Sequence, residues 1–215
     1  IIELFKKEDY TYQNGEFMHR EYDEVLLTGV LRSFLANRYA KNNITEAEID
    51  TCLSRLENIS DTPLYDGNRE TYILVTEGFD LVREDPSELP IHIDFIDFNE
   101  VDNNSFTVIN QYSIKGADET RRPDLIIFIN GIPVGICEFK TAIEEDKTVH
   151  DAWKQITIRY NRDIPNLMKY CFLSVISDGA NNRMGSIFTP YEYYYAWNKA
   201  NDEDKVANGI SSLLT

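Results

Sequence analysis

The first third of the chain shows the spacing of apolar residues that is typical of helices. Over residues 19–39, apolar side chains recur near every third or fourth position, which predicts one helix. A second helix is predicted to start at Thr45, because Glu48 three residues later completes a capping box. A weaker third helix is predicted over residues 66–79, ending at Gly78 or in the charged stretch after it. The second helix is expected to turn these apolar residues inward: Ile49, Cys52, Leu53 and Leu56.

From Pro90 onwards the apolar spacing changes to the period of two that is typical of β-strands. Residues 91–96 and 106–112 are expected to form the two strands of a hairpin. The polar residues 99–104 would be its turn. Residues 115–120 are then expected to form a charged loop.

The remaining segments complete a mixed pattern of strands and helices. Residues 123–129 are a nearly continuous apolar run, which predicts a central strand buried on both faces. Residues 134–139 are expected to return as the next strand after an Asn-Gly turn. Further elements are expected as a helix over 148–161, a buried strand over 171–176, a short strand over 186–188 and a terminal helix from Tyr191. This order predicts a mixed α/β sandwich rather than a βαβ repeat.

Composition narrows the class of protein. The chain has 215 residues, 42% of them hydrophobic, which suits one folded domain or a tight pair. No apolar run reaches the ~18 residues that a membrane span needs. The first residue is Ile1 rather than Met, which suggests an excised piece. Three cysteines lie far apart in sequence and are expected to be buried free thiols: Cys52, Cys137 and Cys171.

Two acids and a lysine stand at the ends of neighbouring apolar strands. Asp124 is followed fourteen residues later by Glu138, and Lys140 lies two residues beyond. Glu138 and Lys140 point to one face of their strand, and Phe139 points to the other. Two carboxylates with a backbone carbonyl suit Mg²⁺, and the lysine could orient or deprotonate a water that attacks a phosphodiester. A surface salt bridge between Lys140 and either acid fits the spacing equally well.

The geometry of the turn decides whether this site can form. A strict two-residue turn at residues 130–131 pairs Asp124 with Cys137 and sends Glu138 to the opposite face. A three-residue loop with its glycine left-handed, or a bulge near Pro123, instead places Asp124 across from Glu138. We therefore predict a register shift between these strands.

Together these residues resemble a nuclease motif. Residues 122–124 (RPD), the Asn-Gly turn and residues 138–140 (EFK) resemble the PD-(D/E)xK motif. The wider sequence resembles the N-terminal nuclease domain of the type I restriction enzyme R subunit (HsdR), and the resemblance covers most of the chain. It includes residues 19–22 (HREY), 110–111 (NQ), 159–160 (RY), 162–165 (RDIP) and 175–179 (VISDG).

The resemblance implies a fold, a domain organisation and a metal site. The fold is α/β, a restriction-endonuclease-like mixed central sheet flanked by helices, with an N-terminal helical segment. Residues 1–215 would be one nuclease domain, with a mainly helical part at 1–88, the core sheet and helix at 89–190, and a C-terminal helix at 191–215 leading to an absent motor region. Asp124 and Glu138 match the Mg²⁺ ligands, and Lys140 matches the catalytic lysine.

The family's Gln-x-x-x-Tyr motif, thought to help position the nuclease site and DNA, is here one residue too long. Gln155 is followed by Arg159 at four residues and by Tyr160 at five. On an α-helix Gln155 and Arg159 share a face, from which they could contact a phosphate, and Tyr160 turns away. Alternatively, Tyr160 lies in the core and Gln155 on the surface. Many such nucleases add an acidic residue from the first helix to the metal site, and Glu21 and Glu24 are the candidates here. Alternatively, both are solvated charges on a helix face.

The resemblance also implies an activity and partners. The chain would be the Mg²⁺-dependent endonuclease domain of a cytoplasmic type I site-specific deoxyribonuclease. It would act on double-stranded DNA together with modification and specificity subunits. No Walker A sequence is present, so ATP would bind only in the downstream motor region. Two alternatives stay open: a standalone PD-(D/E)xK repair nuclease and a non-catalytic docking module of a restriction complex.

The charge of the chain bears on this interpretation. The formal net charge is -16, which by itself argues against a polyanionic partner. Residues 115–170, however, contain nine basic and nine acidic residues, so all of the net charge lies outside the motif segment. The acidic remainder cannot attract DNA. We therefore expect a domain that receives DNA from a motor and partners rather than one that binds it autonomously.

Overall fold

A computed structural model of the chain describes residues 2–140, 148–179 and 181–196. Their centre is a mixed seven-stranded sheet with the spatial order β1-β4-β7-β8-β9-β10-β11. The β1–β4 and β8–β9 pairs are parallel, and the other neighbours are antiparallel. Its strands are β1 (Thr11–Asn14), β4 (Phe106–Asn110), β7 (Leu125–Ile129), β8 (Ile132–Phe139), β9 (Leu173–Ser177), β10 (Asn182–Gly185) and β11 (Tyr195–Ala196). Two smaller sheets pair β2 (Phe79–Leu81) with β3 (Ile91–Ile93), and β5 (Ile114–Lys115) with β6 (Thr120–Arg121).

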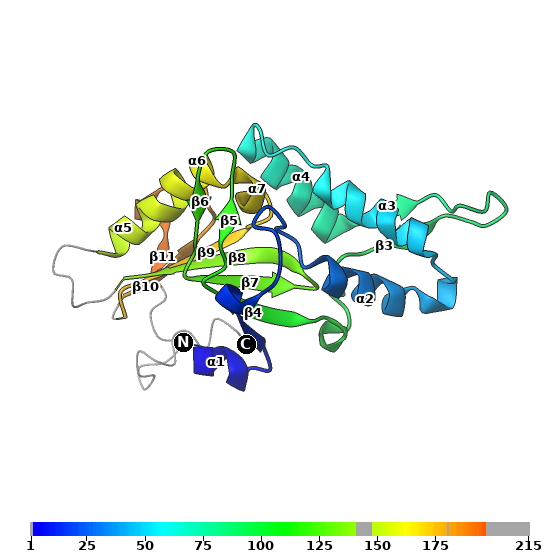
Figure 1. Cartoon of the computed structure of the whole chain (residues 1–215), viewed down its shortest axis with the longest axis horizontal. Helices are drawn as coiled ribbons and strands as arrows, with labels where there is room; N and C mark the ends of the chain where they lie inside the picture. Colours follow the sequence, from blue (N-terminus) through cyan, green and yellow to red (C-terminus); the bar gives the residue numbers. More distant parts are fainter. Residues whose placement is uncertain (1, 141–147, 180, 197–215) are drawn as a thin grey trace.

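Helices flank this sheet, as the sequence predicts for the fold class. Figure 1 shows α1 on one side of the sheet and α5, α6 and α7 on the other, with α2, α3 and α4 gathered beyond one end of the central strands. The α-helices are α1 (Ile2–Lys7), α2 (Thr28–Arg38), α3 (Glu46–Glu57), α4 (Leu64–Glu77), α5 (Val149–Lys154), α6 (Asn161–Asp163) and α7 (Pro165–Met168). A π-helical turn, η4 (Gln155–Tyr160), joins α5 to α6. Short 3₁₀ turns are η1 (Gly15–Phe17), η2 (Ala40–Asn42), η3 (Val101–Asn103) and η5 (Tyr191–Tyr193).

Strand β7 lies between two hydrophobic cores. Its Ile126 and Phe128 belong to the larger core beneath the helices, and its Leu125 and Ile127 pack with Phe5 of α1 on the other face. Both faces of β7 are therefore covered, which confirms the prediction of a central strand. The alternation also decides that Asp124 and Glu138 open onto the face covered by α5 and η4.

The predicted helix over residues 19–39 is wrong in its first half. Residues 19–27 form a loop, and the helix begins only at Thr28. The guanidinium of Arg20 donates hydrogen bonds to the backbone carbonyls of Glu21, Glu24 and Ser113, and its Cζ lies 3.5 Å from the ring centroid of Tyr112. The Arg20 side chain satisfies the local carbonyls of Glu21 and Glu24, and its bond to Ser113 joins the loop to a distant segment, so the segment does not need a helical ladder.

The second helix is confirmed. Thr45 accepts a hydrogen bond from the backbone N–H of Glu48, and the Glu48 carboxylate accepts one from the N–H of Thr45. The four side chains predicted to point inward are all buried. The third helix ends at Glu77, one residue before Gly78, which has a φ of +68°. A Cβ there would lie 2.3 Å from the carbonyl oxygen of Ile93, so this position requires glycine.

The predicted hairpin between residues 91–96 and 106–112 is wrong. Strand β3 pairs with β2 instead, and β4 enters the main sheet between β1 and β7. The buried carboxylate of Asp97 separates the two strands by folding the intervening turn around itself. It accepts hydrogen bonds from the backbone N–H groups of Asn99 and Glu100 and from the amide of Asn103, and it pairs with Arg38.

Two further segments differ from the prediction. The N-terminus supplies α1 and the edge strand β1, which the helical interpretation of the first third missed. Residues 186–188 are a loop, because β10 ends before them, and residues 191–196 form η5 and β11 instead of a helix. The rest of the predicted terminal helix, residues 197–215, lies outside the described residues. The three cysteines are buried and unpaired, as predicted.

No helix in the described part of the chain is both long and apolar enough to cross a membrane. The longest described helix, α4, has 14 residues.

We expect Glu48→Gln to lower the free energy of unfolding at pH 7 by about 2–3 kcal/mol. Glu48 is buried, and a hydrogen bond from Arg83 holds the pKa of its carboxyl down at about 2. Because the folded pKa lies below the unfolded value of about 4.3, the stabilisation is complete above that value and is lost as the pH falls towards 2. Urea denaturation at pH 7 and pH 3 measures this. Glu46→Gln, at an exposed position of the same helix, is the control and should change stability by less than about 0.5 kcal/mol.

Candidate nuclease site

The site depends on a register shift between β7 and β8. At the turn, Ile129 pairs with Ile132, so the Asn-Gly turn has exactly two residues in the left-handed region. One residue further on, the ladder skips Val134, and Leu125 comes to pair with Cys137. By the same register, Asp124 lies across from Glu138.

The predicted register shift is thus confirmed, but it occurs at a different position from either of the two that were expected. It is a bulge inside β8 at Pro133–Val134, neither a three-residue loop nor a bulge near Pro123. Proline has no N–H to give to the ladder, which favours a bulge at this point. The carbonyl of Val134 accepts a hydrogen bond from the N–H of Phe172.

Backbone hydrogen bonds fix Asp124 and the segment that carries Lys140. A carboxylate oxygen of Asp124, Oδ2, accepts a hydrogen bond from the backbone N–H of Phe139 at 2.8 Å. The Phe139 ring packs in the smaller core on the other face of the sheet, as predicted. Beyond β8 the backbone N–H of Lys140 donates to the carbonyl of Ser177 at 2.8 Å, which fixes the start of the segment that carries the lysine.

Lys140 lies in a network with Glu138 rather than in a surface salt bridge. Its Nζ donates to Glu138 Oε1 at 3.2 Å and to Gln155 Oε1 at 2.7 Å. The side chain of Glu138 is only 2% exposed and that of Lys140 only 13%. The site therefore lies in the protein interior at the edge of the larger core.

Burial shapes the electrostatics of the site. Desolvation, and after it the neighbouring charge of Asp124, raise the pKa of Glu138 to about 8 against the lowering effects of Lys140 and Tyr160. Desolvation also raises the pKa of Cys137 to about 12, so this thiol is not a nucleophile near neutral pH. Two close carboxylates with too little positive charge around them form a site that favours a cation.

The π-helical turn η4 explains how Gln155 and Tyr160 can interact although they are five residues apart. Its hydrogen bonds link residues five apart, so Gln155 and Tyr160 lie on the same face. The Gln155 amide donates to Tyr160 Oη at 2.6 Å and to Glu138 Oε1, and Tyr160 Oη donates to Glu138 Oε2 at 3.1 Å. The expectation that Tyr160 turns away from Gln155 is wrong, because it assumes a regular α-helix. Tyr160 is buried, as the alternative had it, but Gln155 is half-buried in the network and not a surface residue.

Arg159 does not share this network. It is exposed and, together with Gln155, lines a cavity of about 620 Å³ beside Lys140. The other side chains around this cavity were not expected from the sequence, although their spacing of three and four residues on one helix face could have shown them. They are Asp151, Lys154, Ile158 and Arg162.

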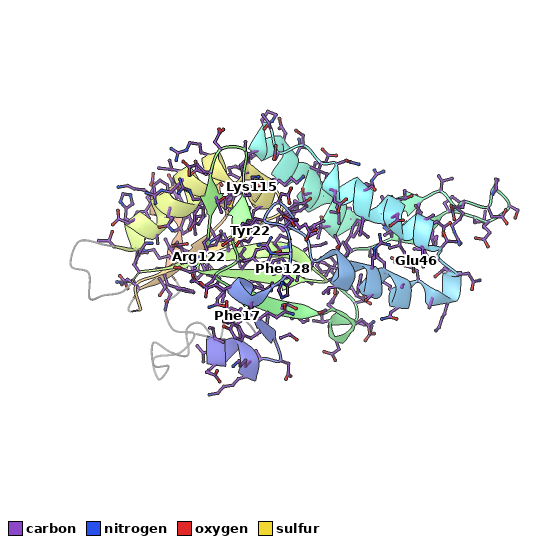
Figure 2. The ribbon with its side chains drawn as sticks, viewed as in Figure 1. Phe17, Tyr22, Glu46, Lys115, Arg122 and Phe128 are labelled. Carbon is purple, nitrogen blue, oxygen red and sulfur yellow. The ribbon has the colours of Figure 1, made fainter. Side chains whose placement is uncertain are left out.

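The acidic candidates near the N-terminus lie on the loop before α2 and not on a helix. Glu21 and Glu24 line a separate cavity of about 730 Å³ with Lys115 and Tyr22, and Figure 2 shows the last two near each other. Across the described ranges, no three His, Cys, Asp or Glu side chains form a cluster that could hold a metal ion. A role for Glu21 in the metal site stays a prediction.

The chain matches one protein family and is similar to several known proteins. The family model described as "Type I restriction enzyme R protein N terminus" matches residues 1–193. A Methanocaldococcus jannaschii protein with the provisional name type I restriction enzyme MjaIXP endonuclease subunit is 29% identical over 95% of this chain and 20% of its own length. The type I restriction enzyme HindI endonuclease subunit of Haemophilus influenzae is 26% identical over 93% of this chain and 19% of its own length. The chain thus spans about a fifth of the length of these relatives.

If η4 arises from one extra residue, deleting that residue should be tolerated. We expect deletion of the half-exposed Ile158 to restore an α-helix that keeps the Gln155–Tyr160 contact, and to lower the free energy of unfolding by less than about 2 kcal/mol. Deletion of Thr51 in the regular helix α3 is the control. It rotates Leu53 and Leu56 out of the core and should cost more than about 4 kcal/mol. Denaturant titration of both variants measures this, and equal losses would contradict the insertion.

Proposed function

Because the chain belongs to the family of type I restriction enzyme R protein N termini, we propose that its sheet-end site hydrolyses DNA phosphodiester bonds with Mg²⁺. The observation that carries the proposal is the register of β7 and β8, which sets Asp124 across from Glu138 with Lys140 on the same face. The names of the relatives, which are restriction enzyme endonuclease subunits, agree with it. The substrate would be double-stranded DNA.

The donor set fits Mg²⁺. The ion prefers oxygen ligands, takes one or two carboxylates from the protein and keeps several waters for exchange with substrate phosphate oxygens. Asp124 and Glu138 supply such a pair, and both would act as ligands. When bound, Mg²⁺ would supply positive charge against the scissile phosphate and lower the pKa of a water molecule.

Within the chain, Lys140 has the position to act on the reacting groups. Its Nζ is fixed by Glu138 and Gln155, so the ammonium can orient a water and offset negative charge on the phosphate without first losing rotamer entropy. Tyr160 and Gln155 hold both oxygens of Glu138, which positions the carboxylate for its role as a ligand. Gln155 and Tyr160 are therefore positioning residues in this proposal.

The proposed partners are those that the resemblance to type I restriction enzymes implies. We propose that the domain acts in a cytoplasmic restriction complex with modification and specificity subunits, and that ATP is used by a motor region beyond this chain. The chain's net charge of -16 suits DNA delivery by such a complex. Two other functions compete with this proposal: a non-catalytic docking module and a standalone repair nuclease. If the domain were a docking module, removing the carboxylate of Asp124 would not reduce DNA cleavage by the complex.

Asp124→Asn and Lys140→Ala should each reduce DNA cleavage by the assembled restriction complex at least about 100-fold. ATP hydrolysis and translocation should stay near the parent level, since the changes lie outside the motor. Plasmid linearisation and ATPase rates measure the two activities. Asp118→Asn, an exposed acid on the β5–β6 loop, is the control and should cleave normally. Unchanged cleavage by Asp124→Asn would favour the docking module.

Metal binding can be measured without turnover. We expect Mn²⁺ soaked into crystals to give anomalous density between Asp124 and Glu138, because these are the paired oxygen donors of the site. The signal should disappear in Asp124→Asn. Density at another position, with none between these carboxylates, would contradict the ligand assignment.

A further inference from the structure

One face of the helix that covers the active strands carries a basic groove. The cavity of about 620 Å³ beside Lys140 is lined along its length by α5, η4 and α6. Lys154, Ile158 and Arg162 follow one another at four-residue steps, and Arg159 lies beside them. Lys140, which the proposed function places at the reacting phosphate, belongs to the same cavity. The groove therefore opens directly onto the site.

The charge of this groove is opposite to that of the chain as a whole. Among the described residues that line it, four of seven are basic, and the chain has a net charge of -16. Asp151, the one acid among those described lining residues, caps α5, where it accepts hydrogen bonds from the N–H and the hydroxyl of Thr148. The groove thus presents a local excess of positive charge where most of the surface would repel a polyanion.

The four basic side chains differ in how strongly they are already paired with other groups. Lys140 is tied to Glu138 and Gln155, and Arg162 pairs with the buried carboxylate of Asp163 through its Nε at 2.6 Å. Lys154 lies 4.0 Å from Asp151, an exposed and weak pair. Arg159 is exposed, and no hydrogen bond or ion pair of its side chain occurs among the described residues. Lys154 and Arg159 are therefore available for a ligand.

We propose that Lys154 and Arg159 bind the backbone phosphates of double-stranded DNA and guide one strand along the groove to Lys140. This inference rests on the proposed function and names how its substrate is held. The face from Lys154 to Arg162 spans at most about 12 Å, at the ~1.5 Å per residue of a regular α-helix over eight residues. One strand places a phosphate every ~3.4 Å along the duplex axis, so a face of that length lies beside about three phosphates.

The apolar residue in the groove fits the same ligand. Ile158 is 53% exposed and lies between the cations, where a lone large apolar side chain gains nothing from water. A deoxyribose between two phosphates offers it an apolar contact. Because phosphates and sugars carry no direct sequence information, this contact positions DNA and does not select a sequence.

The test is DNA binding by the Lys154→Glu/Arg159→Glu double variant, without divalent metal. A fluorescent duplex is titrated with the protein in EDTA at 50–200 mM KCl. We expect weak binding by the parent at 50 mM KCl, because the groove attracts phosphates locally although the acidic chain depends on partners for tight binding. We expect the affinity to fall at least about tenfold, and the slope of log K against log [salt] to become shallower by about two. Arg159→Gln alone should lower the affinity by a smaller factor and make the slope of log K against log [salt] shallower by about one. This single variant tests the proposal even if the double variant does not fold.

Lys41→Glu/Arg69→Glu is the matched control. It makes the same change in charge at exposed positions outside the groove, and it should bind within about twofold of the parent. Unchanged binding by the groove variants, an equal loss in the control, or no binding by the parent at 50 mM KCl would overturn the proposal. Cleavage is assayed separately with Mg²⁺. A parent that binds through the groove but never cleaves would overturn the proposed function and leave the groove in place.

Discussion

The bulge in β8 is the constraint on which the site depends. A regular ladder from the two-residue turn would place Asp124 opposite Cys137 and Glu138 on the other face of the sheet. Skipping Val134 moves every later residue of β8 by one place, so the acid reaches the face that bears Asp124. The shift costs one irregular position in an otherwise buried ladder. It also decides that Phe139 fills the smaller core and that Lys140 returns to the side of Glu138.

A second irregularity, in the covering helix, completes the arrangement. Glu138 is a buried carboxylate and needs donors to be tolerated where it lies. The π-helical turn η4 lets both Gln155 and Tyr160 reach it, which a regular α-helix with this spacing could not do. The sheet and the helix thus each depart from their regular period by one residue, and the two departures meet at Glu138. Irregular turns of this type are common at functional sites.

The excess of acidic residues and the basic groove occupy different parts of the molecule. The acidic residues that give the chain its net charge lie mainly on the N-terminal helices and their loops, and several of them stabilise the fold locally. Glu48 pairs with Arg83, and Asp97 binds Arg38 and a turn of backbone. The helix over the active strands instead presents cations towards the cavity beside Lys140. Acidity and a role towards DNA are compatible because they occupy different surfaces.

The sequence by itself determined the class of fold, the capping box at Thr45, the buried strand β7 and the burial of the cysteines. These features follow from local periodicity and composition, which neighbouring residues in the chain carry. It also showed that a register shift was needed, since the motif could not otherwise assemble.

Tertiary structure decided where the shift occurs, because the position of a bulge depends on how β8 meets both β7 and β9. It decided that residues 19–27 form a loop, since the hydrogen bond of Arg20 to Ser113 and its cation–π contact with Tyr112 join segments distant in sequence. It decided that β3 pairs with β2, and that Tyr160 turns back to Gln155. In each case the competing structure had better local periodicity, and contacts from elsewhere in the chain outweighed it.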